Sequence, residues 1–99
     1  MKKLIIALLL LSAIYSCRKK HWNCDEQVSF KNDIQPMLSK HCVKCHATYD
    51  TYIMAQSLAQ SGSLKESVIN TSRMPKDGSL TKTERKKIYC WIEQGALDN

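Results

Sequence analysis

The sequence predicts a small all-α domain, and three observations support this prediction. No stretch of the chain alternates apolar and polar residues in the manner of a half-buried strand. Four segments instead repeat apolar residues at every third or fourth position, which is the spacing of one helix face. The chain has 99 residues and contains only three glycines and two prolines. This length suits a single domain with a small core.

The first helix is expected to run from about Ser29 or Asn32 to His41. Pro36 fits the first turn of a helix better than its interior, so the start of this helix stays open. Apolar residues at four-residue steps would form one face: Phe30, Ile34, Leu38 and Cys42.

Two short helices are expected in the middle of the chain. The first follows Asp50, a good N-cap residue, and ends before Gly62. Its apolar residues are Ile53, Met54, Ala55 and Leu58. The next one covers about residues 64–70.

The last helix has the clearest boundaries. Thr81 and Glu84 form a capping box at its start, and Gly95 stands where a left-handed residue ends a helix. Ile88, Trp91 and Ile92 share one side with Gly95. Together these four segments give an all-α domain of about four helices.

The N-terminus, residues 1–16, is predicted to be an export signal. Lys2 and Lys3 precede an unbroken apolar run over residues 4–11, and small residues follow. The apolar run is shorter than the roughly 20 residues that a membrane-spanning helix needs, so a permanent span is the weaker interpretation.

Cys17 ends this segment, and Ile14-Tyr15-Ser16-Cys17 resembles a bacterial lipobox. The resemblance implies cleavage before Cys17 and a lipid on its thiol, while ordinary cleavage with a free Cys17 stays open because Tyr15 departs from the usual small residue. Residues 17–28 would then link the membrane to a domain over residues 29–99. The basic run at 18–20 would lie beside anionic headgroups.

Export places the remaining cysteines in an oxidising compartment, where thiols are expected to be bonded. The run Cys42-Val43-Lys44-Cys45-His46 is typical of covalent haem attachment, in which both thiols bond the porphyrin and the histidine ligates iron. A thioredoxin-like redox pair or a zinc site are the alternatives, and the sequence lacks the βαβ pattern or the fourth ligand that they need.

Cys24 and Cys90 are left as one even pair. A disulfide between them would tie the segment before the first helix to the last helix, and two unpaired thiols are the alternative.

The arrangement along residues 28–97 resembles the class I monohaem cytochromes c, and small lipoprotein-type members in particular. The resemblance rests on a helix that runs into Cys-x-x-Cys-His, short middle helices, a Met-Pro loop and a last helix with a buried aromatic residue. The two ends carry it most closely: Ile34-Gln35-Pro36-Met37-Leu38 and Trp91-Ile92-Glu93-Gln94-Gly95-Ala96. It implies a domain whose helices wrap one haem c per chain, with crossing first and last helices. His46 would be the proximal ligand and Met74 the distal one.

Chemistry also favours Met74, because a thioether is a soft, neutral ligand and Pro75 restricts Met74 to extended backbone. The alternatives are an open or water-ligated iron and four other side chains: Met37, Met54, His41 and His21. Four aromatic residues are expected to pack against the haem: Phe30, Tyr49, Tyr52 and Trp91. Arg73 or a tyrosine hydroxyl is a candidate partner for a haem propionate.

Two filled axial positions predict an electron carrier and no enzyme, held by its lipid on the periplasmic side of a bacterial membrane. The alternative is a haem protein with an open distal site, acting as a redox enzyme subunit or gas sensor. Transient redox partners with an acidic surface are expected to meet Lys40, Lys44 and Lys76. The formal net charge of +6 does not indicate nucleic-acid binding, because the basic residues form no stripe with aromatic ones.

Overall fold

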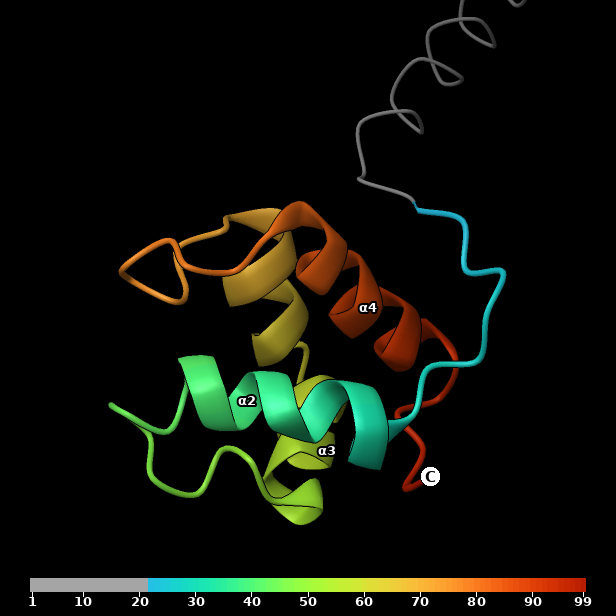
Figure 1. Ribbon diagram of the computed structural model, residues 1–99, viewed down its shortest axis with the longest axis horizontal. Coiled ribbons are helices and arrows are strands. Elements are labelled where there is room, and N and C mark those ends of the chain that lie inside the picture. The colour runs from blue at the N-terminus through green and yellow to red at the C-terminus, as the bar shows by residue number, and fades with distance from the viewer. Residues whose placement is uncertain (1–21) are drawn as a thin grey trace, which may run out of the picture.

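The computed structural model describes residues 22–99, and helices are the only regular elements in that range. Their order along the chain is η2 (Phe30–Ile34), α2 (Gln35–His41), α3 (Tyr52–Gln60), η3 (Lys65–Asn70) and α4 (Lys82–Glu93). Figure 1 shows α2 lying across the molecule, with α4 on one side of it and α3 on the other. The all-α prediction is therefore confirmed for this part of the chain. The predicted signal peptide, Cys17 and His21 lie outside the described residues.

The first helical segment begins at Phe30 with Ser29 as its N-cap, so the earlier of the two expected starts is confirmed. The Ser29 hydroxyl accepts a hydrogen bond from the Asn32 amide, and the Asp33 carboxylate accepts one from the Ser29 amide at 2.9 Å. The first turn, η2, has the wider π-helical pattern and continues directly into α2. Pro36 lies in the first turn of α2, but because η2 continues into α2, it is inside the helical segment and cannot donate a hydrogen bond to the preceding turn.

Helix α3 begins one residue later than the sequence indicates. Thr51 is its N-cap, with its hydroxyl accepting from the Met54 amide at 3.4 Å. The prediction that Asp50 caps this helix is wrong, because its carboxylate instead accepts a hydrogen bond from the Ser39 hydroxyl at 2.9 Å. Asp50 thus joins α2 to the turn before α3.

The last two segments match their expected positions. The third is the π-helical η3, and the fourth is α4. The capping box of α4 is confirmed, since the Thr81 and Glu84 side chains each accept from the other residue's amide at 3.1 Å. Gly95 follows the helix with a φ of +103°, a conformation that favours glycine.

The core lies where α4 packs against η2 and η3. Trp91 and Ile34 are almost fully buried there, and the Phe30 ring packs 5.6 Å from the Trp91 ring. The C-terminus folds back over this core, because the Trp91 indole donates to the Leu97 carbonyl and the Tyr52 hydroxyl donates to the Ala96 carbonyl. These contacts set α2 and α4 in fixed positions on which the loops described below depend.

Residues 22–28, part of the predicted linker, lie against α4. Cys24 and Cys90 form a disulfide with their Cα atoms 5.4 Å apart, which is the pairing that the sequence predicts. Gln94 adds two hydrogen bonds, accepting from the Val28 amide and donating to the Glu26 carbonyl. The packed domain therefore begins before residue 29.

Candidate functional site

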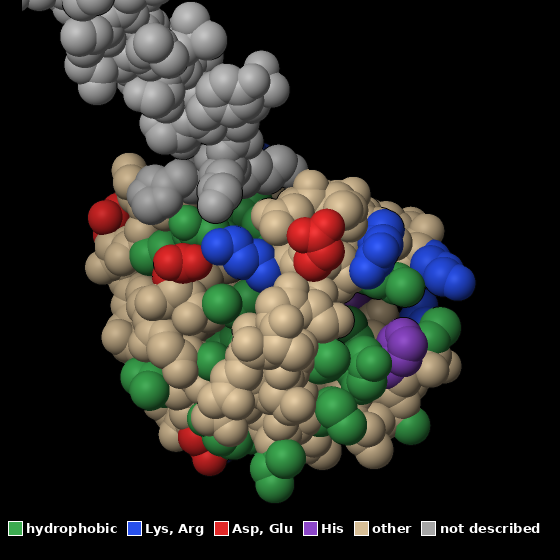
Figure 2. All heavy atoms as spheres, turned by 180° about the vertical axis from the view of Figure 1, so that it is seen from behind, with side chains coloured by type: hydrophobic (Ala, Val, Ile, Leu, Met, Phe, Trp, Pro, Cys, Tyr) green, Lys and Arg blue, Asp and Glu red, His purple; other side chains and the backbone are tan. Residues whose placement is uncertain are grey.

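A cleft of about 480 Å³ lies between the end of α2, helix α3 and the loop that precedes α4. Its size falls in the range of pockets that hold small molecules and cofactors, about 300–1,000 Å³. Most of its surface is apolar, with side chains such as Leu38, Leu58, Leu64 and Val68 in its walls. Figure 2 shows hydrophobic side chains, a histidine and several Lys and Arg side chains gathered around a hollow on the right of the molecule.

Four residues that the sequence singles out line this cleft together: Cys42, Cys45, His46 and Met74. The first three come from the turn that ends α2. Cys42 is the C-cap of α2, and its carbonyl accepts from the amides of Cys45, at 3.3 Å, and His46, at 2.9 Å. This tight turn places two thiols and one imidazole in the lining of the cleft.

The two cysteines at this turn are free thiols. Cys42 is half-buried and Cys45 is exposed. Burial raises the pKa of the Cys42 thiol above its ordinary value, because the apolar surroundings disfavour the thiolate. Neither thiol is in a disulfide, and the Cys42 thiol stays mainly protonated at neutral pH.

The His46 imidazole stacks on the Tyr49 ring, with 4.2 Å between ring centroids and 8° between ring planes. Both rings line the cleft. The stacking fixes the plane of the imidazole in the lining of the cleft.

Met74 reaches the same cleft from the loop between η3 and α4. Its amide donates to the Ser67 carbonyl at 3.0 Å, and its carbonyl accepts from the Arg85 guanidinium at 3.2 Å. The side chain is half-buried and contacts the core. The structure thus brings Met74 into one cavity with His46, although the two residues are far apart along the chain.

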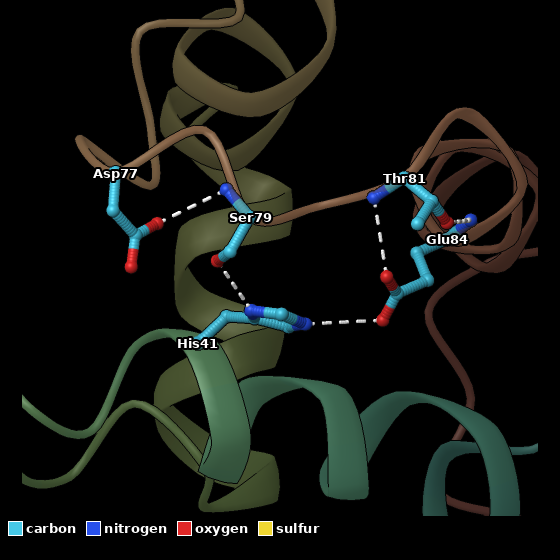
Figure 3. A network of polar contacts seen from close by, with 5 residues as sticks. All are labelled: His41, Asp77, Ser79, Thr81 and Glu84. Carbon is cyan, nitrogen blue, oxygen red and sulfur yellow. Dashed lines mark hydrogen bonds and ion pairs between the residues drawn. The ribbon is translucent and has the colours of Figure 1, made fainter.

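The other candidate ligands within the described residues are either engaged in other contacts or lie outside the cleft. Both ring nitrogens of His41 are engaged, with the Ser79 hydroxyl 2.7 Å from Nδ1 and the Glu84 carboxylate 3.1 Å from Nε2 (Figure 3). Met37 is a core residue, and neither Met37 nor Met54 lines the cleft. Among the described methionines and histidines, His46 and Met74 are therefore the pair left free to ligate a group in the cleft.

Basic residues surround the mouth of the cleft. Lys44, Arg73 and Lys76 line it, together with one carboxylate, that of Asp77. The Lys44 ammonium lies 3.6 Å from the Asp77 carboxylate, and both side chains are mostly exposed. Lys40 is exposed as well, and it does not line the cleft.

Of the four aromatic residues expected to pack against a haem, Tyr49 alone lines the cleft. Phe30 and Trp91 are buried in the helix interface, and the Tyr52 ring meets Phe30 edge-on at 5.3 Å. The physical reason is direction: these rings lie on the faces that η2, α3 and α4 turn toward one another. They hold the helices together and form no wall of the cleft.

Arg85 and Ser79 are the site residues that sequence reasoning did not single out. Arg85 donates to the carbonyls of Val68 and Met74, which fixes the loop that carries Met74. Ser79 is separated from its partner His41 by 38 residues. Hydrogen bonds between residues that are far apart along the chain leave no periodic pattern or motif in the sequence.

Residues 22–99 contain no group of three or more His, Cys, Asp or Glu side chains placed to hold a metal ion. No helix in that same range is both long and apolar enough to cross a membrane. No family model, curated protein or solved structure gives a significant match to this chain.

Proposed function

We propose that the protein is a monohaem c-type cytochrome that carries single electrons between redox partners outside the cytoplasm. The observation that carries the proposal is the meeting of Cys42, Cys45, His46 and Met74 in one apolar cleft. Two thiols, an imidazole and a thioether form the donor set that a covalently bound haem needs. The cleft supplies them from two segments far apart in the sequence.

The two cysteines would hold the cofactor. Each S–H would add across one vinyl group of the porphyrin, with sulfur bonding one carbon and hydrogen the other, so no oxidant is required. Free thiols three residues apart on the turn after α2 suit this double attachment. The protonated state of Cys42 is compatible with it, since the addition consumes a thiol proton.

His46 and Met74 would be the residues that hold the haem iron. Haem iron supplies a one-electron redox couple, whose potential depends on the axial ligands and on burial. A methionine ligand favours the reduced state, because a soft thioether stabilises Fe(II) more than Fe(III). If both residues held the iron, no position would be left for a substrate, and the protein would transfer electrons without bond chemistry.

The basic residues at the cleft mouth support a docking role. Lys44, Arg73 and Lys76 outnumber the single carboxylate of Asp77 there. This imbalance would attract an acidic surface on a redox partner and steer brief encounters. The expected signature is an electron-transfer rate that falls as ionic strength rises.

The signal peptide and the lipid on Cys17 belong to the proposal as sequence-based predictions. They would place the domain on the periplasmic face of a bacterial membrane, tethered by the segment that begins at Cys17. Export also provides the oxidising compartment in which a disulfide such as Cys24–Cys90 persists.

The test is an absorption spectrum of the purified holoprotein. The ferric wild type should show low-spin haem with the weak far-red band of a Met–Fe(III) bond. Met74→Ala should lose that band, whereas Met54→Ala, a methionine outside the cleft, should keep it. Tight binding of carbon monoxide by the reduced wild type would contradict the proposal and favour an open-site sensor or redox enzyme.

A further inference from the structure

The loop between η3 and α4, residues 71–81, has little apolar anchoring of its own. Met74 and Pro75 are half-buried and Leu80 is buried, while the other residues of the loop are exposed. Segments with few buried apolar contacts open easily unless other contacts hold them. The position of Met74 therefore depends on the polar contacts of this loop.

One of these contacts is made to the backbone of Met74 itself. The Arg85 guanidinium, from the first half of α4, donates through one nitrogen to both the Met74 and the Val68 carbonyls. The Met74 amide meanwhile donates to the Ser67 carbonyl at 3.0 Å. Arg85 is half-buried, and hydrogen bonds from a charged donor are stronger than those between neutral groups. The backbone on both sides of the Met74 side chain is thus tied to η3 and α4.

A second contact holds the far end of the loop (Figure 3). A carboxylate only accepts hydrogen bonds, so His41 Nε2 donates to Glu84, and in the neutral ring Nδ1 accepts from the Ser79 hydroxyl. The Ser79 amide also donates to the Asp77 carboxylate at 3.0 Å. His41 is buried and ends α2, directly before Cys42.

Both contacts lead to neighbouring residues of α4, Glu84 and Arg85. The capping box with Thr81 fixes the Glu84 side chain at the start of that helix. One helical turn, itself packed on the core, therefore holds both ends of the loop over the cleft.

Resting on the proposed function, we infer that Arg85 is the positioning residue for the distal ligand, assisted by the His41–Ser79 contact. Arg85 does not itself line the cleft, and it acts through its hydrogen bond to the Met74 backbone. It keeps the thioether in place when thermal motion breaks the bond to iron. An external ligand would then bind only after the loop has moved away.

The experiment measures cyanide binding to the ferric holoprotein at 25 °C, well below its unfolding temperature. Because Met74 must dissociate first, the limiting rate at high cyanide reports how firmly the loop holds it. Arg85→Met should raise this rate about tenfold, as expected for the loss of the charge-assisted hydrogen bond to the Met74 carbonyl, and should weaken the far-red band. Arg85→Lys, which keeps a cationic donor, should restore part of the wild-type behaviour.

Lys86→Met is the matched control, because it removes the same charge from the next residue of α4, an exposed one that does not line the cleft. It should leave both the rate and the band unchanged. A merely structural role for Arg85 would lower the unfolding temperature without changing the cyanide rate at 25 °C. Equal rates in Arg85→Met and Lys86→Met would overturn the inference.

Ser79→Ala provides a second test, because Ser79 is an exposed residue and the change removes only its hydroxyl bond to His41. We expect a severalfold faster cyanide reaction, and an unchanged rate would refute the part assigned to the His41–Ser79 contact.

The controls also separate the two proposals. A wild type without haem or without a far-red band refutes the proposed function, whereas a normal wild type with an unaffected Arg85→Met variant refutes the positioning role alone.

Discussion

Removing the Cys24–Cys90 disulfide is expected to destabilise the domain strongly. Cys24 and Cys90 are separated by 66 positions in the sequence, so the bond closes most of the domain into one loop. In the chain-entropy model, a loop of this length restricts the unfolded state by about 4 kcal/mol. Small domains commonly have total stabilities of about 5–15 kcal/mol, so the expected loss is a large fraction of the whole.

The assay is urea unfolding of the holoprotein of the Cys24→Ala/Cys90→Ala variant beside the wild type. Cys90 is only 3% exposed, so its replacement also removes buried packing; the single variant Cys24→Ala keeps the Cys90 thiol and isolates the effect of the bond. The slope of the unfolding free energy against urea concentration should become steeper, because an unfolded chain without the disulfide exposes more surface. A reductant should destabilise the wild type and leave the double variant unchanged. A difference below about 1 kcal/mol between the wild type and Cys24→Ala would refute the reasoning.

Two further predictions concern helix ends. Thr51→Ala should lower the free energy of unfolding by about 1 kcal/mol, because it removes the cap of α3. Asp50→Ala should change the free energy of unfolding by less than about 0.5 kcal/mol. If urea unfolding gave the opposite order, Asp50 would be the N-cap after all. The hydrogen bond from the Ser29 amide, aided by Lys87, lowers the pKa of Asp33. A lowered folded-state pKa means that the ionised carboxylate stabilises the fold above the ordinary aspartate pKa of about 3.9 and loses this effect as pH falls through the folded value. Asp33→Asn should therefore be less stable than the wild type at pH 7, by up to about 1 kcal/mol, and the difference should shrink at pH 3; a difference independent of pH would contradict this assignment.

Features encoded within a few residues were predictable from the sequence. The capping box of Thr81 and Glu84 depends on a spacing of three residues, and the turn that brings Cys42, Cys45 and His46 to the cleft is equally local. The Cys24–Cys90 pair was predictable for a different reason, since assigning the other cysteines left these two. In each case the interacting groups can be identified from the sequence without knowing how the helices pack.

Features decided by distant contacts were not predictable in this way. Asp50 and Thr51 are both good N-cap residues, and the choice between them depends on the Ser39 hydroxyl, which occupies Asp50. Phe30 and Trp91 are aromatic and apolar wherever they point, and only the packing of η2 on α4 directs them into the helix interface. Tertiary packing, which local patterns do not record, decides such cases.

Covalent haem on Cys42 and Cys45 can be tested by mass spectrometry of the protein expressed with a haem-maturation system. We expect a gain of one haem mass on the intact chain, located by digestion to the peptide that contains both Cys42 and Cys45. Alkylation should then modify neither of these thiols, while Cys24 and Cys90 should stay linked until reduced. A chain that carries no haem, and whose Cys42 and Cys45 both react with the alkylating reagent, would contradict the account.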